Sequence, residues 1–387
     1  MSDPILVVIF LRGGADALNI ISPTADPDYI AARPDYLRVL RQGDGQGIAL
    51  GDGALGGGMA DLDFRLHAAA SDLGELFHAG DLSILHATGL REATRSHFDA
   101  ESRIERATTG GAAGGAAGGW LGRWLTHVQP GGQLPALAVG TTMPESLRGS
   151  RAALAPEFSE LMLAPGNWLA PALRARLSAG FGSHDLLGAT TQDILALSQV
   201  LQDRYWLADA GELRPYAPAV DYPGDADLSG PLMTVAQAIK ADMGLRVATV
   251  DYGGWDTHAQ QAEAFPALLG GLSRALMAFW RDLGPRQQDV SVVVQSEFGR
   301  RLRSNDSGGT DHGRAGAMLV LGPQARGGRL LGRWPGLSNP ALEEGADLAV
   351  TTDYRDVLAE VLVSHLGLGD PAVVFPGLAA SPPGLFG

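Results

Sequence analysis

The sequence predicts an α/β fold in which a largely parallel central sheet is sandwiched between helices. Short, continuous apolar runs rich in Val, Ile and Leu alternate with segments of helical periodicity from end to end of the chain. Continuous apolar runs are typical of parallel strands that are buried on both faces. Several of these runs end in Gly, Asp or Glu, and the carboxyl ends of such strands are where α/β proteins bind ligands.

The composition narrows the class of protein. The 387 residues are 45% hydrophobic and 19% charged, which is ordinary for a globular chain and compatible with a single α/β domain over residues 1–387. Asp and Glu number 43 against 29 Lys and Arg, and a net charge of −14 disfavours nucleic acid or an anionic membrane as partner. The absence of Cys excludes disulfides, thiolate zinc sites and cysteine nucleophiles.

The predicted strands share an apolar run bounded by turn residues. The first, 5–11, runs into Arg12-Gly13-Gly14, lacks a basic segment before it, and is predicted as a strand and not a signal peptide. No apolar run approaches the ~18 residues of a membrane span. The further predicted strands are 82–85, 134–139, 245–250, 290–294 and 317–321, the last two expected as buried parallel strands.

The predicted helices share a 3.6-residue apolar period. They are 66–79, 96–106, 120–128, 191–208, 232–243, 262–283 and 352–366, with a short helix around Tyr29 inside the long loop 23–58. Residues 110–119, which contain only Gly and Ala, are predicted to be a flexible segment.

Polar residues with the chemistry of metal ligands follow several predicted strands. Asp16 follows the first strand, Asp256 and His258 follow strand 245–250, Glu297 follows strand 290–294, and Asp311 and His312 lie in the glycine-rich loop beyond it. Carboxylates suit Mg²⁺ and Ca²⁺, and imidazoles extend the choice to Zn²⁺ and Mn²⁺. Each residue alone has a plainer reading as a helix cap or turn former. Together they predict a site for one or two divalent cations.

A second candidate group lies at the start of helix 96–106. Ser96 there is either an ordinary N-cap or a nucleophile whose alkoxide is stabilised by a metal and by the positive end of the helix. Arg95 is a candidate clamp for an anionic substrate, and His97 is either a catalytic group or a packed histidine.

Five ordered motifs resemble those of a known bacterial family. Leu-Arg-Gly-Gly-Ala-Asp-Ala-Leu-Asn (11–19), Arg-Ser-His-Phe-Asp-Ala (95–100), Gly-Gly-Trp-Asp-Thr-His (253–258), Ser-Glu-Phe-Gly-Arg (296–300) and Gly-Thr-Asp-His-Gly (309–313) resemble the uncharacterised family numbered 1501 among the domains of unknown function. That family is similar to the alkaline phosphatase and sulfatase superfamily. The resemblance implies an alkaline phosphatase-like fold, a metal site and hydrolysis of phosphate or sulfate esters.

The resemblance also implies residue roles. Asp16 matches the metal-binding Asp of the first strand, and Ser96 is the match for the nucleophile. Asp256 and His258 stand where the superfamily has an Asp/His ligand pair of longer spacing, which leaves Asp251 as the alternative carboxylate. Glu297-Phe298 stands where the superfamily usually shows Asp-His, and His312 stands where a further metal histidine is expected.

The sequence is therefore interpreted as a metal-dependent hydrolase of small phosphate or sulfate esters. The metal would be Zn²⁺, Mn²⁺, Mg²⁺ or Ca²⁺, held by Asp16, Asp256, His258, Glu297, Asp311 and His312, and the catalytic residues would be Arg95, Ser96 and His97. Two alternatives remain: a phosphotransferase or mutase on the same fold, and a catalytically degenerate binding or assembly protein, which Phe298 favours. Members of the family often carry a twin-arginine export signal. The resemblance thus implies an exported or periplasmic protein, although this chain shows no such signal.

Overall fold

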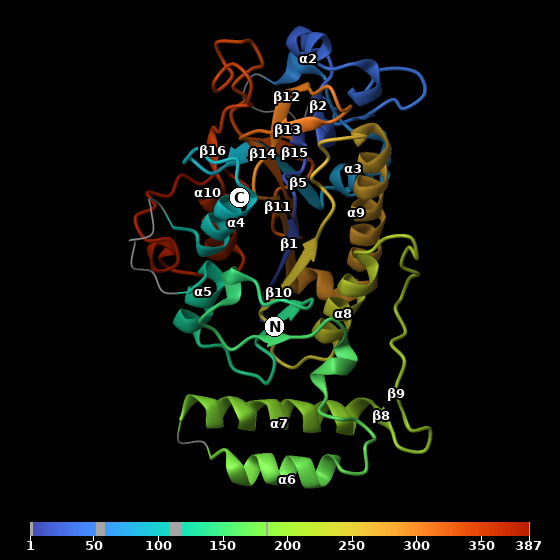
Figure 1. Cartoon of the computed structure of the whole chain (residues 1–387), viewed down its shortest axis with the longest axis vertical. Coiled ribbons are helices and arrows are strands. Elements are labelled where there is room, and N and C mark those ends of the chain that lie inside the picture. Colours follow the sequence, from blue (N-terminus) through green and yellow to red (C-terminus); the bar gives the residue numbers. More distant parts are fainter. Residues whose placement is uncertain (1–2, 52–58, 109–117, 183–184, 387) are drawn as a thin grey trace.

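The computed structural model describes residues 3–51, 59–108, 118–182 and 185–386, and it confirms the α/β architecture (Figure 1). A nine-stranded sheet runs through the molecule in the order β15-β5-β14-β11-β1-β10-β6-β7, with β16 paired to β5. Its strands are β1 (Ile5–Leu11), β5 (Leu82–Gly89), β6 (Ala136–Val139), β7 (Ala153–Leu154), β10 (Val247–Tyr252), β11 (Val290–Ser296), β14 (Gly316–Leu321), β15 (Arg329–Leu331) and β16 (Thr352–Asp353).

Most neighbouring strands of this sheet are parallel, as the sequence predicts. The central strand β1 pairs in parallel with both β10 and β11. Strand β14 is the exception, because it is antiparallel to β11 and to β5. The expectation of a parallel strand at 317–321 is therefore wrong. The chain returns from β11 to β14 through a hairpin of β12 (Arg300–Ser304) and β13 (Thr310–His312), whereas a parallel connection needs a longer crossover, usually a helix.

Two hydrophobic cores cover the two faces of the sheet, and the alternation of side chains along β1 separates them. Ile5, Val7 and Ile9 belong to the core on one face, which is covered by α3 (Ser71–Ala79), α8 (Ser229–Lys240) and α9 (Gln261–Leu283). Leu6 and Val8 belong to the core on the other face, covered by α4 (His97–Arg106), α5 (Trp120–Val128) and α10 (Tyr354–Ser364). Each buried Leu, Ile or Val side chain contributes roughly 1.5–3 kcal/mol by leaving water, so this sandwich fixes the position of the strand ends.

Several of the remaining elements extend the first of these cores, for example through Phe64 and Leu201. A short N-terminal group comprises α1 (Ala17–Ile20), α2 (Pro27–Ala32), β2 (Ile21–Pro23), β3 (Ile48–Ala49) and β4 (Phe64–Leu66). The helices α6 (Ala170–Gly180) and α7 (Leu186–Tyr205) lie side by side at one end of the molecule, followed by the small hairpin β8 (Trp206–Leu207) and β9 (Glu212–Leu213) (Figure 1). Residues 110–117 of the predicted flexible segment lie outside the described residues. No helix in the described ranges is long and apolar enough to cross a membrane.

The carboxyl ends of four strands meet at one edge of the sheet. Strands β10, β1 and β11 are parallel neighbours, and β5 has the same direction because β14 runs antiparallel to both β11 and β5. The loops that leave these four ends, together with the β12–β13 hairpin, carry nearly all the residues that the sequence singles out.

Candidate metal centre at the carboxyl edge of the sheet

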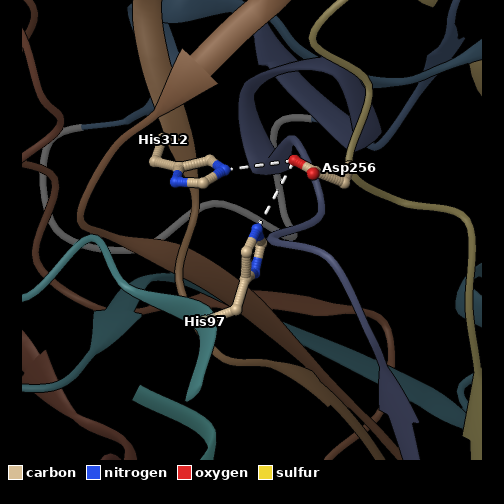
Figure 2. A group of neighbouring side chains, drawn as sticks. All are labelled: His97, Asp256 and His312. Atoms are coloured by element: carbon tan, nitrogen blue, oxygen red, sulfur yellow. Dashed lines mark hydrogen bonds and ion pairs between the residues drawn. The ribbon is translucent and has the colours of Figure 1, made fainter. Parts of the chain in front are cut away.

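Four side chains from three separate stretches of the chain converge at this edge. His97 begins α4, Asp256 and His258 follow β10, and His312 ends β13. One ligand atom each from His97, Asp256 and His312 lie within 4.8 Å of one another, and Figure 2 shows both imidazoles turned toward the Asp256 carboxylate. His258 lies beside them. We call these four residues, His97, Asp256, His258 and His312, the rim cluster.

One carboxylate oxygen is the centre of the rim cluster. Oδ1 of Asp256 lies 3.1 Å from Nε2 of His312, 3.1 Å from Nε2 of His258 and 3.5 Å from Nε2 of His97. The Nε2 atoms of His258 and His312 are 2.8 Å apart. Every imidazole of the rim cluster therefore presents its Nε2 atom to the same oxygen.

The other ring nitrogen of each imidazole contacts an oxygen acceptor. Nδ1 of His97 lies 2.7 Å from Oε1 of Glu297, and Nδ1 of His258 lies 3.2 Å from Oδ1 of Asp311. Nδ1 of His312 lies 2.8 Å from the backbone carbonyl of Arg95. Glu297 is itself fixed, because its buried carboxylate also accepts from the backbone N–H of Gly13 and from the Ser296 hydroxyl.

The charges of these residues favour cation binding. Burial opposes ionisation of Asp256, but the Arg300 guanidinium that donates to it holds its pKa below the usual range. Burial likewise opposes ionisation of Glu297, but several hydrogen bonds, first among them the one with His97, together lower the pKa of Glu297. The Asn305 amide lowers the pKa of Asp311. Burial lowers the pKa of His312, which favours the neutral form of this imidazole.

The donor set fits a divalent cation. Ligands 2.0–2.1 Å from a tetrahedral zinc ion lie roughly 3.3 Å from one another. The contacts of Oδ1 of Asp256 with the three Nε2 atoms, and of Nε2 of His258 with Nε2 of His312, are close to this value at 2.8–3.5 Å. Nε2 of His97 is buried and has no hydrogen-bond partner. A buried nitrogen without a partner costs free energy unless something binds it. The side chains of Asp256 and His258 are nearly half exposed, so the site is open to solvent.

Arg300 ties the loops of the site together, a role that the sequence does not predict. Its side chain is fully buried, and its guanidinium donates to the backbone carbonyls of Gly13, Gly14, Trp255 and Thr310 and to Oδ1 of Asp256. These partners come from the loops after β1 and β10 and from β13. The sequence signal, an Arg directly after Glu-Phe-Gly, does not distinguish a buried tether from an exposed anion clamp.

Phe298 forms an apolar wall of the site. Its ring centroid lies 4.9 Å from that of His97 and 5.0 Å from that of His312. Gly14 makes this position possible, because a Cβ atom there would lie 2.4 Å from Cε2 of Phe298, and the Gly14 φ of +65° is one that L side chains rarely adopt. The aromatic ring thus fills space next to the imidazoles and offers no ligand atom.

The structure does not bring Asp16 into the rim cluster. Both oxygens of its fully buried carboxylate accept hydrogen bonds from the Arg33 guanidinium, at 2.7 and 2.9 Å, and Oδ2 also accepts from Gln261. Of the two candidate carboxylates after β10, Asp256 lies in the rim cluster. Asp251 pairs instead with Arg12 at 2.9 Å.

Of the candidate catalytic residues, His97 belongs to the rim cluster, and Arg95 contacts the cluster through its backbone carbonyl. Ser96 is the N-cap residue of α4 and is exposed, and its side chain makes no capping hydrogen bond. It lies between Arg95, whose carbonyl contacts His312, and His97. The Arg95 guanidinium forms ion pairs with Asp347 and Glu344. A side chain engaged in this way is not free to clamp an anion.

A cavity of about 280 Å³ lies away from the rim cluster, between β6, β7 and α7, and is lined by residues such as Pro135, Leu154 and Ile194. The rim cluster is instead an open site at the sheet edge. Its chemistry, more than an enclosed volume, marks it as the functional candidate.

Comparison with known proteins identifies the family of this chain and several solved structures with distant similarity to it. The model of a family described as "Protein of unknown function (DUF1501)" matches residues 86–376. No curated protein matches the sequence. Similar solved structures include a 2-O GAG sulfatase, with 10% identity over 98% of this chain and 73% of that chain at a TM-score of 0.40. The alkaline phosphatase from the Antarctic bacterium TAB5 is 11% identical over 84% of this chain and 93% of its own, at a TM-score of 0.34.

A third similar structure is the C-terminal periplasmic domain of EcEptC from Escherichia coli in complex with Zn. It is 7% identical over 84% of this chain and 74% of that chain, at a TM-score of 0.36. The TM-scores of these three structures are too low to carry a residue role or a substrate from those proteins to this chain.

Proposed function

The chain belongs to the DUF1501 family of proteins of unknown function, and from that premise and the rim cluster we propose that it is a divalent-cation-dependent hydrolase of small phosphate or sulfate esters. The observation that carries the proposal is the convergence of three Nε2 atoms on Oδ1 of Asp256 at the solvent-accessible carboxyl edge of the sheet.

The residues that would hold the cation are those of the rim cluster. A bound divalent cation supplies Lewis acidity, which polarises a phosphoryl or sulfuryl oxygen and stabilises the charge that develops there. Contacts with Glu297, Asp311 and the Arg95 carbonyl hold the three imidazole rings in their orientations. Phe298 excludes water from one side of the site.

Ser96 is proposed as the nucleophile. Ser96 is exposed and makes no side-chain capping bond, and it lies between Arg95, whose carbonyl contacts His312, and His97 of the rim cluster. The N-terminal end of α4, a helix of ten residues, favours negative charge on Ser96 Oγ or on a substrate oxygen. Ser96 Oγ would attack phosphorus or sulfur as the bond to the ester oxygen breaks, and that oxygen would leave with the proton lost from the Ser96 hydroxyl. Water would then cleave the bond to Ser96 Oγ, releasing phosphate or sulfate and restoring the hydroxyl.

Arg95 is given a different role from the clamp that its position in the sequence suggests. Its guanidinium pairs with Asp347 and Glu344, and its carbonyl accepts from Nδ1 of His312. Arg95 would therefore anchor the loop that carries Ser96, and the substrate anion would be bound by the cation and by the end of α4.

A direct test is hydrolysis of nitrophenyl phosphate, bis-nitrophenyl phosphate and nitrophenyl sulfate by the purified full chain. Activity should disappear after removal of cations with a chelator and return when Zn²⁺ or Mn²⁺ is added. Acceleration by an added alcohol would identify a phosphotransferase on the same site. Chelator-resistant hydrolysis, or no hydrolysis of any ester with any cation, would overturn the proposal.

The second candidate is a binding or assembly protein with a decayed site. The engaged guanidinium of Arg95 and the apolar ring of Phe298 favour it, since neither helps to bind an anionic substrate. In that case the protein would hold a cation, or none, without ester turnover. The ester panel combined with elemental analysis separates the two candidates.

A further inference from the structure

The hydrogen-bond partners of the three imidazoles determine which of their nitrogens carries a proton. The atoms that face Nδ1 of His97, His258 and His312 are a Glu297 carboxylate oxygen, an Asp311 carboxylate oxygen and the Arg95 carbonyl. Carboxylate and carbonyl oxygens only accept hydrogen bonds, so each Nδ1 must donate. In the neutral imidazole the other nitrogen then has a bare lone pair.

When the three imidazoles are neutral, three lone pairs therefore point at one carboxylate oxygen. The Nε2 atoms of His258 and His312 approach each other to 2.8 Å, and both lie 3.1 Å from Oδ1 of Asp256. Nitrogen lone pairs and a carboxylate oxygen repel one another at such distances unless a positive charge lies between them. Nε2 of His97, buried and without a hydrogen-bond partner, completes the set.

The charge of the surroundings corresponds to one divalent cation. Asp256, Glu297 and Asp311 contribute three negative charges, and the buried Arg300 guanidinium, 2.5 Å from Oδ1 of Asp256, contributes one positive charge. The balance is −2. A second divalent cation would leave an excess of positive charge, and the Phe298 ring occupies the space beside His97 and His312 without offering a ligand.

From these contacts we infer that the rim cluster is a site for one borderline transition-metal cation of the Zn²⁺ type, bound by Nε2 of His97, His258 and His312 and by Asp256, with Glu297 and Asp311 as positioning residues and not ligands. Three imidazoles and one carboxylate suit Zn²⁺, whereas Mg²⁺ and Ca²⁺ require oxygen ligands. The inference deepens the proposed function and rests on its cation site.

Because Glu297 and Asp311 each pair with a ligating imidazole, their replacement should change the affinity of the site for the cation. Such partners fix the orientation of the ring and raise its basicity, and their loss typically weakens metal affinity 10–100-fold. Asp306 provides a matched control. It is an exposed carboxylate in the turn between β12 and β13, five residues before Asp311, and the structure gives it no contact with an imidazole.

The experiment is a calorimetric titration of the chelator-treated full chain with Zn²⁺, Mg²⁺ and Ca²⁺, together with the Glu297→Gln, Asp311→Asn and Asp306→Asn variants. We expect one equivalent of Zn²⁺, no displacement by millimolar Mg²⁺ or Ca²⁺, and a dissociation constant raised 10–100-fold in Glu297→Gln and Asp311→Asn. The Asp306→Asn variant should bind within about twofold of the parent, because screened surface charges contribute little. The visible absorption bands of the Co²⁺-loaded protein should keep their energies in Asp311→Asn, because the ligands are unchanged.

Several results would overturn the inference. The first two are binding of two equivalents of Zn²⁺ by the parent and tighter binding of Mg²⁺ or Ca²⁺ than of Zn²⁺. The others are equal Zn²⁺ affinities of the Asp311→Asn and Asp306→Asn variants, and absorption bands of bound Co²⁺ that shift in Asp311→Asn. Should the buried Glu297→Gln variant fail to fold, the half-exposed Asp311 carries the test. Zn²⁺ binding without ester hydrolysis would contradict the proposed function and leave the inference standing. Hydrolysis supported by two cations would contradict the inference alone.

Discussion

Nε2 of His312 lies 3.1 Å from Oδ1 of Asp256, although the two residues are 56 positions apart in the chain. The contact depends on the order of the strands. β1 lies between β10, which leads to Asp256, and β11, and the β12–β13 hairpin that follows β11 carries His312 back over the edge of the sheet. Arg300 then fixes the distance by bonding Asp256 and the Thr310 carbonyl at the same time.

Replacement of Ser96 by Ala should reduce ester turnover by about a thousandfold or more, because the attacking oxygen is lost while the rim cluster is untouched. The cation content should stay at the parental value. The measurement is turnover under saturating substrate, with elemental analysis of the same sample.

Ser102→Ala is the control for this change, since Ser102 lies on the same helix and its hydroxyl bonds Glu145, away from the rim cluster. Its turnover should be close to that of the parent. Full activity in the Ser96→Ala variant would remove Ser96 from the mechanism.

Replacement of Asp16 by Asn should destabilise the protein without releasing a cation. Asp16 and Arg33 form a fully buried bidentate ion pair, and breaking such a pair by changing one partner costs about 3–5 kcal/mol. Urea unfolding measures the loss. A variant of parental stability that has lost its cation would show that Asp16 is a ligand, as the sequence resemblance implies.

Replacement of Arg300 by Lys should lower the free energy of unfolding by about 3 kcal/mol or more, because a single ammonium group cannot bond carbonyls of three loops at once. Since Asp256 loses its partner as well, the affinity for Zn²⁺ should also change. Arg303→Lys, at an exposed position on the same strand, is the control and should unfold like the parent. Equal stability of the two variants would contradict the role of Arg300 as a tether.

Stability should fall between about pH 6.5 and pH 4 because of His86. Burial of this histidine, whose Nε2 contacts the Ile21 carbonyl, lowers its pKa to about 4. In this window the unfolded chain takes up a proton that folded His86 does not, so the free energy of unfolding decreases as the pH falls. The full effect is about 3 kcal/mol, and it is absent above pH 6.5.

The measurement is the free energy of unfolding as a function of pH for the parent and for His86→Asn. The slope between pH 6.5 and pH 4 should be smaller in the variant, whereas His78→Asn, at an exposed position, should keep the parental slope. Identical slopes in all three proteins would exclude a contribution from His86.

Much of the fold follows from the sequence because the apolar periodicities are local. The predicted ranges of the first strand, 5–11, and of the helix 120–128 agree with the structure residue for residue. The direction of β14 does not follow, because an apolar run reads alike in parallel and antiparallel neighbours. Strand direction depends on the connection, here the β12–β13 hairpin.

Part of the candidate site also follows from the sequence, and part depends on the tertiary structure. The sequence points to Asp256, His258 and His312 because these residues follow strands, and to Glu297 for the same reason. It does not show that Glu297 contacts Nδ1 of His97, since that contact joins residues 200 positions apart. The buried pair of Asp16 and Arg33 and the tether of Arg300 are likewise products of tertiary packing, which residue spacing alone does not encode.

The most direct test of the account is the cation content of the purified chain compared with its Asp256→Asn and Asp251→Asn variants. The two carboxylates follow the same strand, and only Asp256 faces the three imidazoles, whereas Asp251 pairs with Arg12. Elemental analysis after dialysis against Zn²⁺ should find one equivalent in the parent and in Asp251→Asn, and little in Asp256→Asn. A parent chain that retains no cation, or an Asp256→Asn variant that retains as much as the parent, would contradict a metal centre at this edge of the sheet.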